Sequence, residues 1–173
     1  NKAYNLTAVK DPSEMITRHL LDSLSLLPFV KGPRIIDVGS GPGLPGIPLA
    51  ICRPDLDVTT LDSNGKKTRF QNQVKVELGL SNLTVINGRA EQCDAAPFNE
   101  VVSRAFASMA DMIKWTHQLC CQDGVFLAMK GLYPTDELSQ LPDNIVLKSS
   151  HSLDVPSTQG ARHLMVLGEV KSG

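Results

Sequence analysis

A glycine-rich bend after a short apolar strand constrains the fold of this chain more than any other feature. The apolar run Ile35-Ile36-Asp37-Val38 leads into Gly39-Ser40-Gly41-Pro42-Gly43-Leu44-Pro45-Gly46, and a helical pattern follows. Alternating glycines allow a sharp turn whose backbone approaches a ligand closely. Asp62 ends the next predicted strand, 23 residues after Gly39, where a carboxylate is positioned to accept hydrogen bonds from an adenosine ribose. The bend therefore predicts an α/β domain with a nucleoside-binding crevice.

Apolar strand patterns alternate with helical patterns along most of the chain. Strands are predicted at 34–38, 57–62, 83–87, 100–105 and 125–130, and a further pair at 145–153 and 163–170. Helices are predicted at 11–27, 46–52, 65–79, 108–121 and 134–141. Strand–helix alternation favours parallel pairing with right-handed crossovers. We expect a doubly wound, mostly parallel seven-stranded sheet with helices on both faces, closed by an antiparallel hairpin as in Rossmann-like class I methyltransferases.

The length of 173 residues fits a single domain. Within it we expect an N-terminal helical segment over residues 1–31 and the doubly wound core over 32–173. The chain opens at Asn1 without an initiator Met, so we expect the N-terminal segment to be truncated. We find neither internal repeats nor a second domain.

Composition and charge narrow the function classes. The apolar runs are too short to cross a bilayer and no signal peptide is present, so we expect a cytoplasmic protein. A net charge of −1 gives no support to a free-standing, sequence-independent nucleic-acid binder. Cys52, Cys93, Cys120 and Cys121 show neither a C-x-x-C pair nor metal-type spacing with the four histidines. We therefore expect reduced, mostly buried thiols and no metal site.

The bend is compatible with more than one ligand. Residues 41–46 also satisfy the dinucleotide pattern G-x-G-x-x-G, and a tight turn with no ligand is a further interpretation. Pro42 and Pro45, however, remove two of the N–H groups on which pyrophosphate recognition depends. The chain also leaves no room for the separate substrate domain that hydride-transfer enzymes usually carry. S-adenosylmethionine, which has no phosphate, is therefore the favoured cofactor.

The absence of two motifs limits which atoms can accept the methyl group. Methylation of pyrimidine carbon five requires a cysteine nucleophile, usually after proline, and no cysteine here follows a proline. Methylation of an exocyclic amine commonly uses an Asp/Asn-Pro-Pro-aromatic motif after the fourth strand, where this chain has Val102-Ser103-Arg104-Ala105-Phe106. Methylation of purine N7 needs neither the cysteine nucleophile nor this motif, because the N7 lone pair is free at neutral pH. Catalysis would then rest on alignment and on the placement of charge.

Seven segments carry a specific resemblance that runs in order along essentially the whole chain. They are N-K-A-Y-N-L-T (1–7), R-H-L-L-D-S (18–23), I-D-V-G-S-G-P-G-L-P-G-I-P-L-A (36–50), L-D-S (61–63), S-R-A-F-A-S (103–108), M-K-G (129–131) and R-H-L (162–164). Together they resemble the bacterial 16S ribosomal RNA guanine-N(7) methyltransferase family, also called glucose-inhibited division protein B. The resemblance implies 7-methylguanosine as product, in the decoding-region hairpin of 16S rRNA.

The resemblance also assigns roles to residues. It implies a donor site that involves Gly39, Gly41, Leu44, Asp62, Ala90, Glu91 and Arg104. It implies an acceptor site formed by Asn5, His19, Asp22, Arg89, Arg104 and Lys130. Because the net charge is low, we expect the partner to be 16S rRNA within a 30S particle, with ribosomal proteins supplying part of the docking surface. We expect a monomer that binds neither membrane nor metal.

Ordinary structural explanations compete with several of these roles. His19 and Asp22 lie three apart on the predicted helix, which is also typical of a solvent-exposed polar face. Lys66, Lys67 and Arg69 are more often a solvated helix face than an RNA track. Phe70, Val74 and Leu78 line one face of the predicted helix 65–79, and Trp115 is expected in the core beside Met112 and Leu119. The competing functions are methylation of tRNA or a small molecule, a noncatalytic S-adenosylmethionine-binding module, and a nicotinamide-dependent oxidoreductase.

Overall fold

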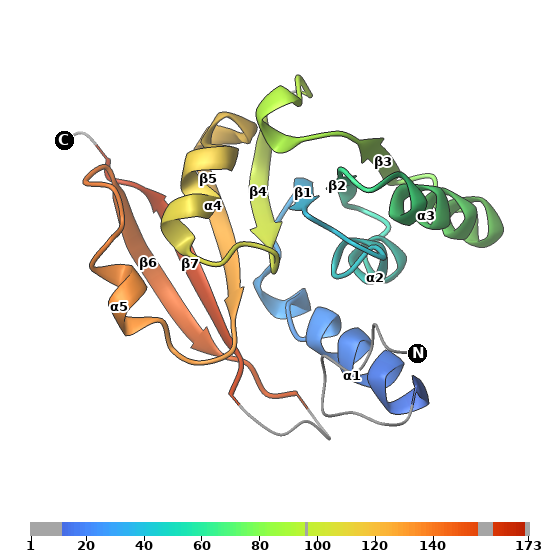
Figure 1. The fold of residues 1–173 in the computed structure, drawn as a ribbon, viewed down its shortest axis with the longest axis horizontal. Helices are drawn as coiled ribbons and strands as arrows, with labels where there is room; N and C mark the ends of the chain where they lie inside the picture. The colour runs from blue at the N-terminus through green and yellow to red at the C-terminus, as the bar shows by residue number, and fades with distance from the viewer. Residues whose placement is uncertain (1–11, 96, 156–160, 172–173) are drawn as a thin grey trace.

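In the computed structural model a central sheet carries helices on both of its faces (Figure 1). The structure describes residues 12–95, 97–155 and 161–171. The strands are β1 (Arg34–Val38), β2 (Asp57–Asp62), β3 (Leu83–Asn87), β4 (Phe98–Ser103), β5 (Cys120–Lys130), β6 (Ile145–Ser152) and β7 (His163–Glu169). The α-helices are α1 (Pro12–Leu24), α2 (Gly46–Cys52), α3 (Gly65–Leu78), α4 (Met109–Thr116) and α5 (Thr135–Leu138). The short 3-10 helices are η2 (Leu27–Phe29), η3 (Ala90–Gln92) and η4 (His117–Leu119). None of the helices in these ranges is long and apolar enough to span a bilayer.

The described residues form one seven-stranded sheet in the order β3-β2-β1-β4-β5-β7-β6. Pairing is parallel from β3 through β5. Strand β7 runs antiparallel to both β5 and β6. The predicted fold class, a mostly parallel doubly wound sheet closed by an antiparallel hairpin, is confirmed. The chain order reverses between β1 and β4, where open α/β sheets form a ligand crevice beyond the carboxyl ends of their strands.

Two hydrophobic cores, one on each face, hold the helices to the sheet. In β1, Ile36 packs into the core that contains Met109 and Met112 of α4. Its neighbour Ile35 packs into the opposite core, which contains Leu49 of α2. Successive residues of a strand point to opposite faces, so a run of apolar residues is what a strand covered on both sides requires. Helix α1 packs on α2 and thus extends this second layer.

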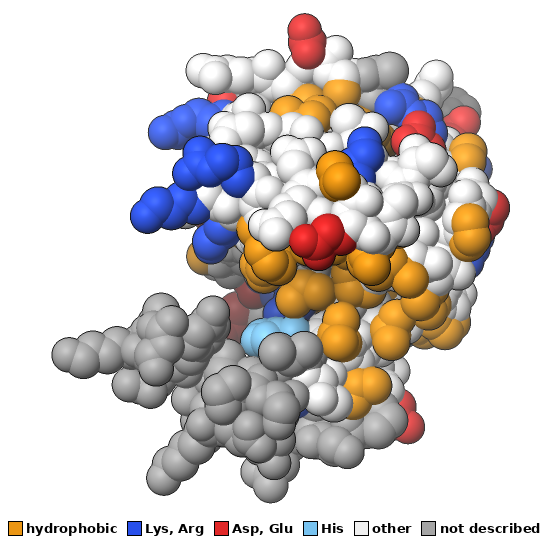
Figure 2. Space-filling model, turned by 90° about the vertical axis from the view of Figure 1, so that its right-hand side faces the viewer, with side chains coloured by type: hydrophobic (Ala, Val, Ile, Leu, Met, Phe, Trp, Pro, Cys, Tyr) orange, Lys and Arg blue, Asp and Glu red, His pale blue; other side chains and the backbone are white. Residues whose placement is uncertain are grey.

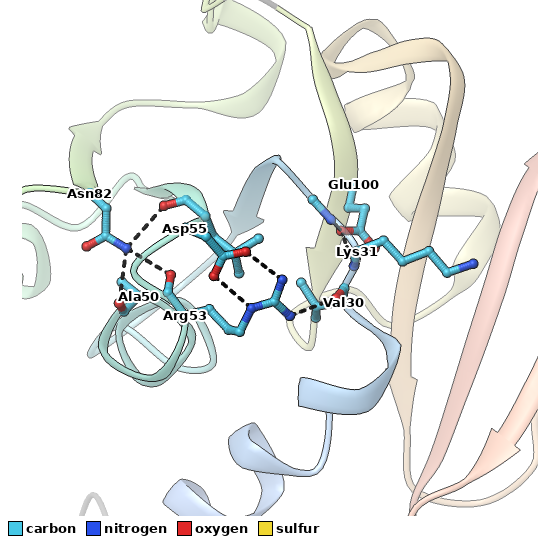
Figure 3. Close-up of polar contacts among 9 residues, drawn as sticks. Val30, Lys31, Ala50, Arg53, Asp55, Asn82 and Glu100 are labelled. Atoms are coloured by element: carbon cyan, nitrogen blue, oxygen red, sulfur yellow. Dashed lines mark hydrogen bonds and ion pairs between the residues drawn. The ribbon is translucent and has the colours of Figure 1, made fainter.

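Polar side chains tie together the amino ends of the strands (Figure 3). Asn82 donates through Nδ2 to three carbonyl oxygens at the end of α2 and in the loop that follows, at 3.0–3.2 Å. Arg53 donates to the carbonyl oxygen of Val30 at 3.1 Å. Buried Glu100 accepts the N–H of Lys31 at 3.0 Å, just before β1. These hydrogen bonds are made within the protein, so the side chains at this edge of the sheet have a structural role.

Several predicted boundaries were wrong. Helix α4 ends at Thr116 and β5 already begins at Cys120, whereas one helix was predicted over 108–121 and the strand only from residue 125. Strand β4 begins two residues earlier than predicted and ends at Ser103. Helix α1 ends at Leu24 instead of residue 27, and α5 covers only four residues of the predicted 134–141. Short apolar runs such as Leu119-Cys120-Cys121 fit helix and strand periodicities alike, so tertiary pairing decides between them.

Two apolar side chains on the predicted apolar face of α3 are not covered by the core. Phe70 is 52% exposed and Leu78 56% exposed. They lie with Leu24 and Ile51 along an apolar groove of about 350 Å³ between α1, α2 and α3. The apolar side chains on this side of the molecule are visible in Figure 2. The cysteines also differ from expectation, because Cys52 is exposed and Cys93, Cys120 and Cys121 are half-buried.

Candidate active site

A crevice of about 320 Å³ opens at the carboxyl edge of the sheet, beside the switch point between β1 and β4. Its size falls within the range of ordinary small-molecule pockets. Its walls come from the ends of β1 and β2, from the loop after β3 with η3, from the loop after β4 and from α4. The lining residues are Val38, Gly39, Leu61, Asp62, Ser63, Gly88, Arg89, Ala90, Glu91, Phe106 and Trp115.

Backbone alone forms the floor of the crevice at Gly39. This residue has a φ of 71°, and a Cβ built on it would lie 2.5 Å from Cβ of Ala105. Its N–H and that of Ser40 both donate to the carbonyl oxygen of Leu61, at 2.8 and 3.1 Å. Glycine is thus required here by both conformation and space. The backbone of the bend is bare at this point, and the close approach to a ligand stays a prediction.

Asp62 links the glycine bend to the start of α3. Its Oδ2 accepts the N–H of Gly41 at 2.8 Å, and its Oδ1 accepts the N–H of Asn64 at 2.8 Å. A carboxylate has about four acceptor positions, so the two oxygens retain lone pairs toward the crevice that they line. Gly41 does not line the crevice itself, and this hydrogen bond connects it to Asp62, which does. The ribose contact predicted for Asp62 stays a prediction, supported by its place at the crevice wall.

Two residues that hold the bend were missed by the sequence analysis. Gln71 is fully buried, and its Nε2 donates to the carbonyl oxygen of Gly41 at 2.7 Å and to Oγ of Ser40 at 2.9 Å. Asp37 is 1% exposed, and its Oδ2 accepts the N–H of Gly46 at 2.9 Å. Burial raises the pKa of Asp37 to about 8, against smaller lowering effects of Gly46 and of Arg104, so its carboxyl group is mostly protonated at pH 7. An acid inside an apolar strand was the available signal for Asp37.

The far wall of the crevice comes from η3 and α4. Ala90 is buried, and its carbonyl oxygen accepts from Nε2 of Gln118 at 3.0 Å. Glu91 is exposed and lies 3.9 Å from Arg89, a separation that makes only a weak ion pair. Trp115 was predicted in the core, but it is 40% exposed and lines the crevice. Met112 and Trp115 share the spacing of one helix face, but only Met112 is covered by the core, at 1% exposed.

A second polar cluster brings the loop after β4 against α1. Nη2 of Arg104 lies 3.3 Å from Nδ1 of His19. Asp22, one turn along α1, is 6% exposed, and its Oδ1 lies 3.2 Å from Nε of Arg162, just before β7. Burial and then the charge of Arg104 lower the pKa of His19, which keeps its ring neutral at pH 7. Among the described residues, the buried Nη1 of Arg104 has no hydrogen-bond partner.

The remaining predicted site residues are spread more widely. Lys130, at the end of β5, lies 3.0 Å from Oε1 of Glu137 and donates to the carbonyl oxygen of Ala107 at 3.2 Å. Its ammonium group thus already has protein partners. Leu44 lines the apolar groove instead of the crevice, so the structure does not support its predicted donor contact. Arg89 is at the rim of the crevice, and Asn5 lies outside the described residues.

The residues present fit S-adenosylmethionine in chemical type. The bend offers bare backbone at Gly39, which a Cβ would fill. Asp62 offers a carboxylate for hydroxyl groups, and the aromatic rings of Phe106 and Trp115 offer apolar walls. A nucleotide pyrophosphate is matched less well, because the only cation among the described lining residues is Arg89, at the rim.

The chain is similar over nearly its whole length to the members of one protein family. The family model described as rRNA small subunit methyltransferase G matches residues 1–165. The chain is 58% identical over 168 residues to the ribosomal RNA small subunit methyltransferase G of Pseudomonas syringae pv. syringae (strain B728a), and the match covers 96% of this chain and 78% of that protein. It is 54% identical over 169 residues to the protein of the same name from Yersinia pseudotuberculosis serotype O:3 (strain YPIII), covering 96% of this chain and 82% of that protein.

Solved structures share the fold at low sequence identity. TrmN from Thermus thermophilus matches with a TM-score of 0.69 at 16% identity, over 86% of this chain and 48% of that chain. A mutant of MtNAS in complex with S-adenosylmethionine matches with a TM-score of 0.68 at 17% identity, over 98% of this chain and 71% of that chain. At such identities the similarity establishes the architecture and leaves function to the site.

Proposed function

The chain belongs to the rRNA small subunit methyltransferase G family, and from this premise we propose that it transfers a methyl group from S-adenosylmethionine to N7 of a guanine in 16S rRNA. The observation that carries the proposal is the position of two sites along one edge of the sheet. The crevice takes the donor, and the cluster of Arg104, His19 and Asp22 receives the guanine. Arg104 follows β4, whose strand neighbour β1 leads into the glycine bend, so the two sites adjoin.

Donor binding rests on the residues that line and support the crevice. When bound, S-adenosylmethionine supplies an electrophilic methyl group on a sulfonium. The bend at Gly39 permits close backbone approach, and Asp62 would accept hydrogen bonds from the ribose hydroxyls. Ala90 and Glu91 would hold the adenine. Gln71 keeps the bend in place by bonding to the carbonyl oxygen of Gly41.

The acceptor cluster orients a nucleophile that needs no general base. Guanine N7 carries a free lone pair at neutral pH, so the protein only has to align it and to accommodate the charge that develops. The unpartnered Nη1 of Arg104 is a donor for O6 of the guanine or for a phosphate, which leaves the N7 lone pair free to attack. Asp22, held by Arg162, supplies a carboxylate near the purine ring as that ring becomes positive. Neutral His19 adds hydrogen bonding without a second positive charge.

We further propose that the substrate is an assembled 30S particle and that the protein acts as a monomer. The net charge of −1 leaves only local positive surface for RNA, so ribosomal proteins would complete the docking surface.

Methyl transfer from tritiated S-adenosylmethionine tests the proposal directly. The protein is incubated with 30S particles, naked 16S rRNA or tRNA from cells that lack the methyltransferase. The proposal expects label in 16S rRNA, most rapidly in the 30S particle, and at least a hundredfold slower labelling with Arg104→Ala. Label in tRNA alone would establish the competing tRNA activity. Donor binding without any transfer would favour a noncatalytic module, and calorimetric binding of a nicotinamide dinucleotide would favour an oxidoreductase.

A further inference from the structure

The first two turns of α3 carry three exposed cations, Lys66, Lys67 and Arg69, here called the α3 cationic surface. Within the described part of the chain none of the three forms an ion pair or a side-chain hydrogen bond. By contrast, Arg34 and Arg53 each pair with a nearby aspartate, Asp57 and Asp55. Figure 2 views the molecule from the side that carries α3 and shows Lys and Arg side chains gathered along one edge. The cations of this surface are therefore available to an anionic partner.

The position of these cations does not help the helix. The amino end of a helix carries partial positive charge, which favours acids and disfavours bases in its first turn. The first turn of α3 contains no acidic residue, and the cap is the neutral side chain of Asn64, which accepts from the N–H groups of Lys66 and Lys67. Three cations therefore lie in the first two turns, at the positive end of the helix dipole, where the Asp62 carboxylate bonded to the N–H of Asn64 is the neighbouring acid. An anionic partner would offset this unfavourable placement.

The α3 cationic surface borders the donor crevice. Nζ of Lys67 lies 4.0 Å from the point where a Cβ on Gly41 would stand, so its side chain reaches back over the glycine bend. Nη1 of Arg69 lies 3.4 Å from the corresponding point on Gly65, at the beginning of the helix. Asn87, just before the crevice wall at Gly88, donates to Oγ1 of Thr68 at 2.9 Å. The surface is thus continuous with the crevice rim, where Arg89 adds a fourth exposed cation.

We propose that the α3 cationic surface binds the phosphate backbone of the rRNA strand that flanks the target guanine. This inference rests on the proposed function and adds a docking surface to it. A flexible, strongly hydrated ammonium group suits a phosphate contact that positions the RNA without reading its sequence. The surface is local, which agrees with a net charge of −1 over the whole chain.

The triple variant Lys66→Gln, Lys67→Gln, Arg69→Gln tests the proposal on unmethylated 30S particles. We expect KM for the particle to rise about tenfold or more, while kcat and the Kd for S-adenosylmethionine stay within about twofold. Removing one phosphate-binding cation makes the dependence of log affinity on log salt less steep by about 0.7–0.9, so the slope should fall by about two to three. Because the removed charges oppose the helix dipole, Tm should be unchanged or higher.

Two matched variants complete the design. Lys148→Gln removes one exposed cation from β6, at the opposite edge of the sheet from α3, and should leave KM and the salt slope unchanged. Lys66→Arg with Lys67→Arg retains the charges and should retain KM. A triple variant with the KM and salt slope of the wild type overturns the inference. A raised Kd for S-adenosylmethionine with unchanged KM for the particle also overturns it, because the cations would then serve the donor. If the wild type methylates no rRNA, the proposed function itself is wrong. Failure of the docking inference, in contrast, shows only when the variants are compared with an active wild type.

Discussion

Nη2 of Arg104 lies 3.3 Å from Nδ1 of His19, and this contact joins the loop after β4 to α1 across 85 residues of sequence. One side of the guanidinium is thereby fixed, while the buried Nη1 has no partner among the described residues. A buried donor left unpaired is costly unless a ligand completes it. The arrangement therefore defines where an acceptor group of the substrate would bind.

Removal of this guanidinium should affect both catalysis and the neighbouring histidine. With Arg104→Ala we expect methyl transfer to fall by about a hundredfold or more, the effect typical of losing one well-placed donor. Burial and the charge of Arg104 both lower the pKa of His19, so that pKa should rise in the variant. NMR titration of the imidazole signal measures it. An unchanged pKa would mean that the two side chains do not interact in solution.

Asp62 should matter for donor affinity, both as a ribose contact and as a support of the glycine bend. Asp62→Ala removes the acceptor for the N–H groups of Gly41 and Asn64 and the carboxylate at the crevice. Hydrogen bonds to charged groups contribute about 1.5–3 kcal/mol, so calorimetry should show Kd for S-adenosylmethionine raised by roughly 10–100-fold. Asp57→Ala, at the exposed start of the same strand, is the control and should not change that Kd. Equal effects of the two substitutions would remove Asp62 from the donor site.

Gly39 and Gly79, two of the glycines with positive φ, should respond differently to alanine. Both have positive φ, 71° and 62°, so each substitution incurs conformational strain of about 1–3 kcal/mol. Only at Gly39 would the new Cβ also meet another atom, Cβ of Ala105 at 2.5 Å, whereas among the described residues nothing lies within 4 Å of that point at Gly79. Overpacking adds about 1–3 kcal/mol. Urea unfolding should therefore show a larger loss for Gly39→Ala, and equal losses would contradict the tight fit of the bend.

The buried carboxyl group of Asp37 should make stability depend on pH. Its pKa is about 8 in the folded protein and about 4 when unfolded. Between these values the folded state binds the extra proton, so the free energy of unfolding falls as pH rises from about 4 to 8. Asp37→Asn keeps a neutral acceptor for the N–H of Gly46 and should flatten this dependence. Chemical denaturation at several pH values measures it, and parallel curves for variant and wild type would show that Asp37 ionises normally.

The sequence was sufficient for the architecture because the fold depends on local, repeated patterns. The apolar strand before Gly39 and the acid at Asp62 located the crevice correctly. Contacts between distant segments were not accessible in the same way. The ion pair of Asp22 with Arg162 spans 140 residues, and nothing in either local sequence indicates it. Such pairings depend on how the layers stack.

The exposure of individual side chains was harder to predict than the architecture, because it too depends on contacts between distant segments. Periodicity identifies the apolar face of a helix but not what covers it. Phe70 and Trp115 follow helical spacing, yet each lies beside an opening in the surface instead of inside the core. Gln71 shows the opposite case, because a polar residue on α3 is fully buried where it holds the glycine bend.

Mass spectrometry of rRNA nucleosides tests the central claim most directly. Unmethylated 30S particles are incubated with the protein and with S-adenosylmethionine that carries a deuterated methyl group, and the 16S rRNA is then digested. The account predicts one nucleoside with the heavy methyl, 7-methylguanosine, at about one per 16S molecule. Heavy methyl on another nucleoside or another atom of guanine, or no transfer at all, would contradict it.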